Sequence, residues 1–323
     1  MEGSRFKVQR SKFKVQRAQD KLSMESTLKS MDTEEFIDIH FYRPIGYRWA
    51  LLFDKLNIAP NTVTIAGIII GIAAGICFGF SSLQLNILGM LLLIWANIHD
   101  SADGQLARMT GKKSVLGRML DGLCGILWFA VIYVAICFRM TSSWGIWIWI
   151  LAVVSGYFHG KQTTMADYYR NIHLFFLKGK SGSELEDFAT LNENYRKLSW
   201  RKDFIYKLFD SYYIIYTKDQ ESLTPKFQQM MQIIRENYLE EVPEWFRAAF
   251  REKSLPLMKY TNMLSFNTRV IALFIALFIN QPWLYFIFEL TVLNSMLIYM
   301  RAKHERICKE FREKLIDTKP CLT

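Results

Sequence analysis

Long apolar runs alternate with polar connectors along most of the chain. A helix needs about 20 mainly apolar residues to cross the hydrocarbon core of a bilayer. Runs of this kind predict an all-α integral membrane bundle of about six transmembrane helices. The six predicted spans are Thr62–Phe80, Leu83–Ala102, Val115–Cys137, Trp144–Tyr157 with an extension to about Met165, Asn267–Phe278 with its flanks, and Trp283–Met300.

The segment before the first apolar run mixes bulky apolar residues with charged ones. Thr33–Leu56 predicts one or two amphipathic helices interrupted at Pro44. Such a helix either lies in the membrane interface or docks on the same face as an ordinary solvated helix. Further upstream, Ser4–Arg10 is followed by a nearly identical Ser11–Arg17. We interpret this repeat as part of a low-complexity leader ahead of a start at Met24 or Met31, rather than as a membrane-surface arm.

These patterns divide the chain into segments. The only large polar stretch, residues 171–260, predicts a soluble insertion with helices around Glu184–Lys197, Lys226–Tyr238 and Pro243–Lys253. The predicted segments are a basic leader (1–31), an interfacial amphipathic helix (32–57), transmembrane helices one to four (58–170), the insertion (171–260), transmembrane helices five and six (261–302) and a tail (303–323).

Basic residues gather on alternate connectors, and the net charge is +10. By the positive-inside rule, both termini, the insertion and the connector with Arg108 and Arg118 are predicted to be cytoplasmic in a multi-pass cell-membrane protein. Because the basic residues flank apolar runs, they favour an anionic membrane or a phosphate-rich ligand over nucleic acid. The five cysteines form no C-x-x-C pair, so we expect no zinc knuckle, redox motif or disulfide framework.

Three acidic residues lie where the second and third predicted spans meet. Asp100 and Asp103 are three residues apart, so they share one helix face. Gly117 and Asp121 are four residues apart and share a face of the next helix. A short connector makes the two helices antiparallel neighbours. The spacing therefore predicts that three carboxylates converge.

Carboxylates clustered at a membrane repel one another unless a cation neutralises them. Their hard oxygen ligands suit Mg²⁺ or Mn²⁺. Arg108 adds a forked donor for phosphate, and Gly104 and Gly117 remove side-chain bulk beside the acids. The combination favours a site that handles phosphate. Single acids near helix ends are often only caps or solvated groups, but the whole ordered pattern is hard to explain in that way.

The same residues resemble the signature of the CDP-alcohol phosphotransferases (CDP-alcohol phosphatidyltransferases), D-x2-D-G-x2-A-R-x8-G-x3-D-x3-D. Pro60, Asn61 and Thr64 also resemble the family's P-N-x-x-T entry to the first span. Ser114 occupies a position where the family often has a small hydroxyl residue. The signature positions present here are Asp100, Asp103, Gly104, Ala107, Arg108, Gly117 and Asp121.

The resemblance implies transfer of a phosphatidyl or phospho-alcohol group from a CDP-linked donor to an alcohol acceptor, with release of CMP. It implies two divalent metals, Mg²⁺ or Mn²⁺, held by Asp100, Asp103 and Asp121, with Asp121 as the bridge. The donor is CDP-diacylglycerol or a CDP-amino-alcohol, and the short connector favours the former. Membrane lipids and a homodimer are the other implied partners. The implied substrate-binding residues are Asn61, Thr64, Gly104, Ala107, Arg108, Ser114 and Gly117.

One signature acid is missing, because the position four residues after Asp121 is Gly125. In the family this acid helps to bind the second metal and is the usual candidate for the general base. Its absence weakens the second metal site and leaves the catalytic base open, with His99 and His159 as weak candidates. For His99, a histidine that faces a neighbouring helix is the simpler interpretation.

The missing acid leaves two functions open. One is an active phosphotransferase of phospholipid biosynthesis, and the other is a weakened or inactive relative that binds CDP-alcohol and metal as a regulatory or binding protein. General-base catalysis contributes typically 10²–10⁴-fold, so its loss is compatible with slow turnover. A transporter is disfavoured, because the motif acids cluster at one side of the membrane and no matching acids continue through predicted spans three or five.

Overall fold

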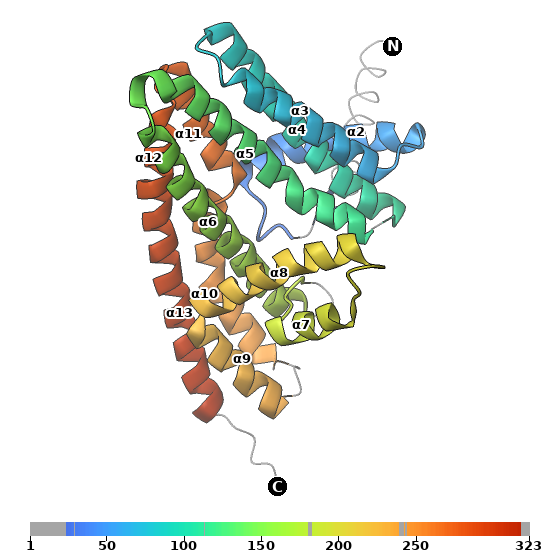
Figure 1. Ribbon diagram of the computed structural model, residues 1–323. Helices are drawn as coiled ribbons and strands as arrows, with labels where there is room; N and C mark the ends of the chain where they lie inside the picture. Colours follow the sequence, from blue (N-terminus) through green and yellow to red (C-terminus); the bar gives the residue numbers. More distant parts are fainter. Residues whose placement is uncertain are drawn as a thin grey trace, which may run out of the picture. The chain divides into compact units, whose positions relative to one another are not determined.

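The structure, a computed structural model, describes residues 24–28, 30–112, 114–179, 183–238, 242 and 244–317 (Figure 1). These residues form helices joined by turns and short connectors, and no strand occurs among them. The chain divides into two compact units, Met1–Trp144 and Gly145–Thr323. The repeat at Ser4–Arg17 and most of the predicted leader lie outside the described residues.

The first unit is built around three long helices that correspond to the first three predicted spans. They are α3 (Pro60–Cys77), α4 (Leu83–Thr110) and α5 (Val115–Trp144). Glycines in α3 allow the helices to approach closely, as is common between membrane helices. A Cβ atom at Gly71 would lie 2.0 Å from the indole nitrogen of Trp128 in α5, and one at Gly67 would lie 3.2 Å from Cβ of His99 in α4.

The amphipathic segment forms a helix that docks on α4 of this bundle. A π-helical turn, η1 (Asp38–Tyr42), leads directly into α2 (Arg43–Lys55). The predicted interruption at Pro44 is therefore wrong. The N–H of Arg43 bonds to the carbonyl of Asp38 five residues earlier, and Pro44 falls in the first turn of α2, where a missing N–H costs little.

Both predictions for this segment, docking on the protein and contact with the membrane interface, have support, each on a different face of the helix. On the inner face, Gly46 and Ala50 are buried; a Cβ atom at Gly46 would lie 2.8 Å from the hydroxyl of Ser101 in α4. Gln105 of α4 is fully buried and donates to the backbone carbonyl of Arg43 at 3.1 Å. On the outer face, apolar side chains such as Leu56 remain 60% exposed, as expected for contact with lipid.

The second unit contains the remaining helices. Five helical stretches of the described chain are long and apolar enough to cross a membrane, and two of them belong to this unit: Glu244–Phe278 and Trp283–Asp317. The fourth predicted span lies in α6, which does not meet the same measure, because its second half is polar. The helices are α6 (Trp147–Lys178), α7 (Phe188–Lys197), α8 (Phe204–Leu223), α9 (Pro225–Tyr238), α10 (Glu244–Met263), α11 (Phe266–Phe278), α12 (Trp283–Phe288), η3 (Glu289–Leu293) and α13 (Asn294–Asp317).

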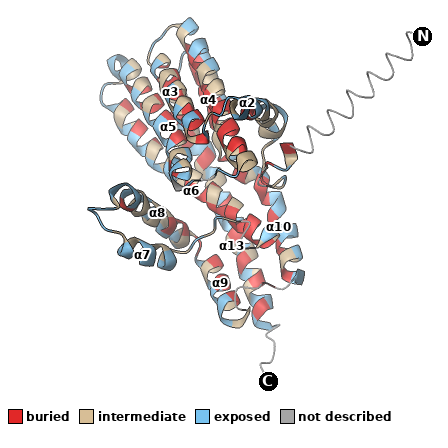
Figure 2. Ribbon diagram, turned by 90° about the vertical axis from the view of Figure 1, so that its right-hand side faces the viewer, coloured by how far each residue is buried: buried red, intermediate tan, exposed pale blue. Residues whose placement is uncertain are grey.

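An aromatic core holds the polar half of this unit together. Phe176 of α6 packs against Phe246 and Phe250 of α10, with ring centroids 5.4 and 4.1 Å apart. Phe311 of α13 completes the cluster at 5.0 Å from Phe246. Figure 2 shows buried segments on α6, α10 and α13. The predicted insertion is therefore a packed helical region continuous with the spans.

A buried ion pair links the apolar helices of the second unit. Arg269 of α11 and Glu289 of η3 are both fully buried, and their charged atoms lie 2.6 Å apart. Arg269 also donates to the side-chain oxygen of Gln162 at 2.7 Å and to the carbonyl of Leu264. Tyr285 donates to Glu289 at 2.6 Å. The pair is thus surrounded by hydrogen bonds, as a charge inside a membrane protein requires.

We expect Glu289→Gln to destabilise the protein by about 3–5 kcal/mol, because it leaves the Arg269 charge buried without its partner. Thermal unfolding of the purified protein, followed by size-exclusion chromatography, measures the effect. Glu193→Gln is the control: it removes an exposed pair with Lys197 and should leave the unfolding temperature unchanged. Equal unfolding temperatures for both variants would contradict a stabilising role for the buried pair.

Candidate functional site

The three predicted acids converge in the first unit. Asp100 and Asp103 lie near the end of α4, and Asp121 lies in the second turn of α5. Each offers a carboxylate oxygen, and the three oxygens lie within 4.8 Å of one another. Asp103 is buried, Asp100 is half-buried and Asp121 is exposed. The predicted convergence of the carboxylates is therefore confirmed as geometry.

The connector between α4 and α5 makes this approach possible. Gly111 ends α4 with a positive φ of 67°, a left-handed conformation that glycine adopts without strain. The hydroxyl of Ser114 then accepts the N–H of Gly117 at 2.9 Å and caps the start of α5. Two tight ends joined by a short connector bring the acids of both helices together.

The start of α3 forms another wall of the site. Ser114 donates to the side-chain oxygen of Asn61 at 3.4 Å. One turn later, the hydroxyl of Thr64 has two acceptors in reach for its one proton, the carbonyl of Pro60 at 3.2 Å and the carboxylate of Asp103. A Cβ atom at Gly117 would lie 2.8 Å from the Asn61 oxygen, so only glycine fits there without displacing its neighbours. Asn61, Ser114 and Gly117 thus contact one another, and Thr64 connects the start of α3 with the acids.

Arg108 folds back along α4 beside the acids. Its two terminal nitrogens would lie 3.3 Å from a Cβ atom at Gly104, so the glycine makes room for the guanidinium. Nε of Arg108 is buried and has no hydrogen-bond partner among the described residues. Ala107 precedes it and is half-buried. An arginine with an unused donor next to an acidic cluster is suited to bind an anionic group that a cation also contacts.

The donor set fits a divalent metal. Oδ2 of Asp103 is buried and lacks a hydrogen-bond partner within the described part of the chain. An orphaned carboxylate oxygen is unfavourable unless a cation or a donor occupies the position next to it. Three carboxylates at this spacing supply the hard oxygen ligands that Mg²⁺ and Mn²⁺ prefer.

The position of the missing acid is open. A Cβ atom at Gly125 would meet no atom within 4 Å, and Asp121 precedes it by one helical turn. Gly122 has the same open surroundings. The glycine at 125 therefore leaves room for a larger side chain.

The two candidate histidines have other partners. Nδ1 of His99 lies 3.0 Å from the carbonyl of Trp95, and its ring contacts Trp95 and Phe53. These contacts match the interpretation of a histidine that faces a neighbouring helix. His159 belongs to the second unit, where its Nδ1 lies 2.9 Å from Glu289. It is therefore part of the buried ion-pair network.

Charged residues of the N-terminal segment lie near the acids, which the sequence pattern did not suggest. Asp38 and Arg43 act electrostatically on Asp100, and Arg43 forms an ion pair with Glu34 at 3.1 Å. These residues precede the motif by more than fifty positions. No spacing rule connects them with the motif, and only the docking of α2 on α4 brings them close.

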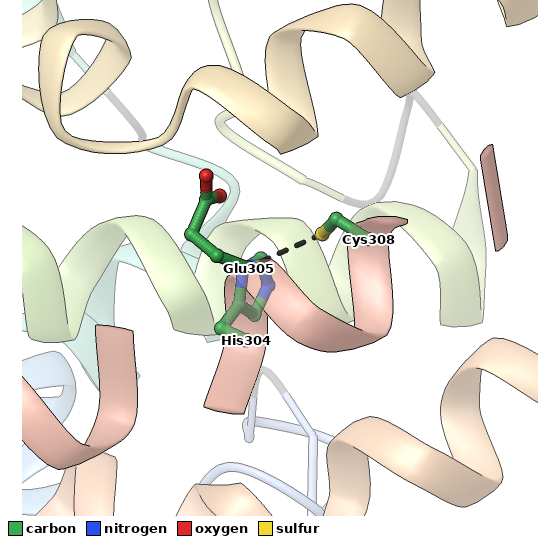
Figure 3. Close-up of side chains that lie close together, drawn as sticks. All are labelled: His304, Glu305 and Cys308. Atoms are coloured by element: carbon green, nitrogen blue, oxygen red, sulfur yellow. Dashed lines mark hydrogen bonds between the residues drawn. The ribbon is translucent and has the colours of Figure 1, made fainter. Parts of the chain in front are cut away.

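A second group of metal-type side chains lies on α13 (Figure 3). Nδ1 of His304 is 3.5 Å from the sulfur of Cys308, and each of His304, Glu305 and Cys308 has one ligand atom within 4.8 Å of the others. The Glu305 carboxylate accepts the N–H of Lys226 at 2.7 Å, so it caps α9. The His304 ring packs at 4.5 Å from Tyr169. We attribute this group to packing and helix capping.

The fold and the site together define a multi-pass helical membrane protein with an acidic site where α4 meets α5. Residues 57–169 match the family model described as CDP-alcohol phosphatidyltransferase. This part of the chain is therefore a CDP-alcohol phosphatidyltransferase domain. The family consists of phosphotransferases that act on CDP-alcohols at membranes, and it generally depends on divalent metal.

An uncharacterized protein of Aquifex aeolicus (strain VF5) is 38% identical over 69 residues, which is 21% of this chain and 34% of the relative. The chain thus spans about a third of the length of that relative. No solved structure matches the chain significantly.

Proposed function

We propose that the protein is a metal-dependent membrane phosphotransferase. It transfers a phosphatidyl or phospho-alcohol group from a CDP-linked donor to an alcohol acceptor and releases CMP. The convergence of Asp100, Asp103 and Asp121 within 4.8 Å carries this proposal. The family domain over residues 57–169 supports it independently.

In this proposal the three aspartates would hold two divalent metals, Mg²⁺ or Mn²⁺. When bound, the metals supply charge neutralisation at the diphosphate of the donor. Asp103 is the most constrained ligand, because it is buried and bonded to Thr64. Asp121 is exposed and lies on the open side of the site.

The neighbouring residues bind and orient the donor. Arg108 directs its forked donors at a phosphate, and Gly104 keeps the path to them free. Asn61 and Ser114 hold the nucleotide part through side chains that already bond to each other at 3.4 Å. Thr64, Ala107 and Gly117 complete this surface.

The reaction forms one bond and breaks one. The acceptor hydroxyl oxygen bonds to the β-phosphorus, and the bond between this phosphorus and the oxygen of CMP breaks. The hydroxyl proton must leave, and Gly125 provides no acid to receive it. Proton removal is therefore the step that this chain performs least well. The short connector between α4 and α5 supports CDP-diacylglycerol as the donor.

The direct test combines the purified protein with CDP-diacylglycerol or CDP-ethanolamine, a set of alcohols, and Mg²⁺ or Mn²⁺. The proposal expects metal-dependent release of CMP with one donor class, and chelation with EDTA should stop it. If no donor yields CMP above a protein-free control, the catalytic proposal fails.

A second candidate is supported by Gly125 itself. A family member without this acid could bind CDP-alcohol and metal for regulation without turnover. In that case CDP-alcohol plus Mn²⁺ would raise the unfolding temperature while CMP stayed at background. The thermal shift and the CMP assay, run on the same sample, separate the two candidates.

The donor surface gives a further expected result. Gly117→Ala places a methyl group 2.8 Å from Asn61 and 3.0 Å from Ser114, so both side chains must move. Losing one of their hydrogen bonds to the donor, at about 1 kcal/mol, should raise the KM for the donor roughly fivefold. Gly122→Ala is the control, because its methyl group meets no atom within 4 Å. Equal KM values for the two variants would contradict this role of Gly117.

The orientation and the assembly remain part of the proposal. The basic connectors support a site and termini on the cytoplasmic side of the membrane. The homodimer is supported only by the family resemblance.

A further inference from the structure

Helix α8 has an inverted distribution of apolar and polar side chains. Its buried residues are Lys207, Thr217 and Gln220. Its exposed residues include large apolar ones. They are Phe204 (57% exposed), Ile205 (62%), Tyr206 (50%), Leu208 (55%), Tyr212 (47%) and Ile215 (64%). A helix surrounded by water has the opposite arrangement.

The exposed apolar residues other than Tyr206 form one continuous stripe. Relative to Phe204 they follow at one, four, eight and eleven positions, which places all five within about a third of the helix circumference. We call Phe204, Ile205, Leu208, Tyr212 and Ile215 the α8 stripe. Contiguous apolar surface of this kind marks an interaction site rather than scattered exposure.

Polar contacts on the inner face fix the orientation of this helix. The ammonium of Lys207 donates to the carbonyl of Leu198 at 2.6 Å and lies 4.6 Å from the ring of Tyr195. Near the other end, Gln220 donates to the carbonyl of Thr164 in α6 at 3.1 Å. These bonds hold α8 with its polar face inward and its apolar stripe outward.

Further contacts fix α8 beside the ends of the apolar runs of α6 and α13. The last turn of α8 accepts a hydrogen bond from Arg301 to the carbonyl of Leu223 at 2.8 Å, and Asp219 pairs with Lys161. An uncharged run follows Glu289, and Arg301 is the first charged residue after it. Lys161 is the first lysine of α6. Figure 1 shows α8 lying across the direction of α13. If α13 crosses the bilayer, α8 therefore runs along its surface.

Basic residues surround the start of α8. Trp200 is 50% exposed just before the helix. Lysine and arginine beside a bulky apolar face are typical of helices that lie in an anionic membrane interface. The exposed basic residues here are Arg196, Lys197, Arg201 and Lys202.

We propose that the α8 stripe inserts into the boundary between headgroups and acyl chains of the adjacent leaflet, with the flanking basic residues on anionic phospholipid. Helix α8 is then an interfacial membrane anchor. Its partner is the lipid surface rather than a protein. This role is independent of the phosphotransferase reaction.

The test uses the full chain, reconstituted in vesicles of phosphatidylcholine and phosphatidylglycerol, with p-benzoylphenylalanine in place of one tyrosine. Tyr212→p-benzoylphenylalanine probes the stripe. Tyr206→p-benzoylphenylalanine is the matched control, because Tyr206 is a tyrosine of the same helix, 50% exposed, about 120° away around the axis. After irradiation, mass spectrometry counts lipid adducts and protein crosslinks at each position.

The proposal expects at least fivefold more lipid adducts at position 212 than at position 206. Equal lipid yields at the two positions, or none at either, would overturn it. So would crosslinks from position 212 to another part of the chain or to a second copy, since these would show that protein covers the stripe. Leu208→p-benzoylphenylalanine repeats the test on the same stripe if the Tyr212 variant does not fold.

Discussion

Asp103→Asn is expected to lower CMP release by roughly 10³-fold or more, because it removes several kcal/mol of charge stabilisation, at about 1.4 kcal/mol for each tenfold. Asparagine keeps the shape of the side chain, and its amide oxygen retains the bond to Thr64. The change therefore removes the negative charge with little effect on packing. The measurement is the initial rate of CMP release at saturating Mn²⁺.

The control for this variant is Asp54→Asn, an exposed aspartate of α2 away from the acids. It should keep the full rate. Both variants should also elute as folded protein in size-exclusion chromatography. In addition, Asp103→Asn should lose the thermal stabilisation by Mn²⁺ that the unchanged chain shows. An Asp103→Asn protein that is folded and retains more than a tenth of the rate would rule out Asp103 as a metal ligand.

Gly125→Asp is expected to raise the rate of CMP release by about 10²-fold or more, since a positioned general base contributes typically 10²–10⁴-fold. The new carboxylate would stand one helical turn after Asp121, where the structure has open space. Replacing a helical glycine also removes part of its conformational cost. The gain should appear in kcat, while the KM for the donor changes little.

Gly122→Asp is the matched control, because it adds the same charge to α5 in equally open surroundings, three residues before the position of the signature acid. It should leave the rate unchanged. Equal increases in both variants would mean that added negative charge, rather than its position, causes the effect. If Gly125→Asp has no effect while the unchanged chain is active, another group already removes the proton.

Local spacing was sufficient to predict the acidic site. Separations of three and four residues determine which side chains share a helix face, and a short connector forces two helices to be neighbours. The convergence of Asp100, Asp103 and Asp121 followed from these rules alone. The same rules gave the positions of α3, α4 and α5, because an apolar run of sufficient length in a membrane protein forms a helix.

Other features depend on contacts that spacing cannot reveal. Arg269 looks like one more basic residue at the start of a span, yet it is fully buried because Glu289 lies opposite it in a helix twenty residues later. The π-helical turn before Pro44 depends on a single shifted hydrogen bond. Helix α8 was not among the helices predicted for the insertion, and its apolar stripe faces outward rather than toward a core.

The hydroxyl of Ser114 joins the start of α5 to the start of α3, because it accepts from Gly117 and donates to Asn61. Local order and ligand affinity are therefore thermodynamically linked at this residue. A ligand that binds Asn61 and Ser114 in their present positions must also protect the Gly117 amide from hydrogen exchange. Conversely, a change that loosens the first turn of α5 must lower the affinity for that ligand by the same free energy. Hydrogen exchange at the connector between α4 and α5 therefore reports whether the site is occupied, even when no reaction takes place.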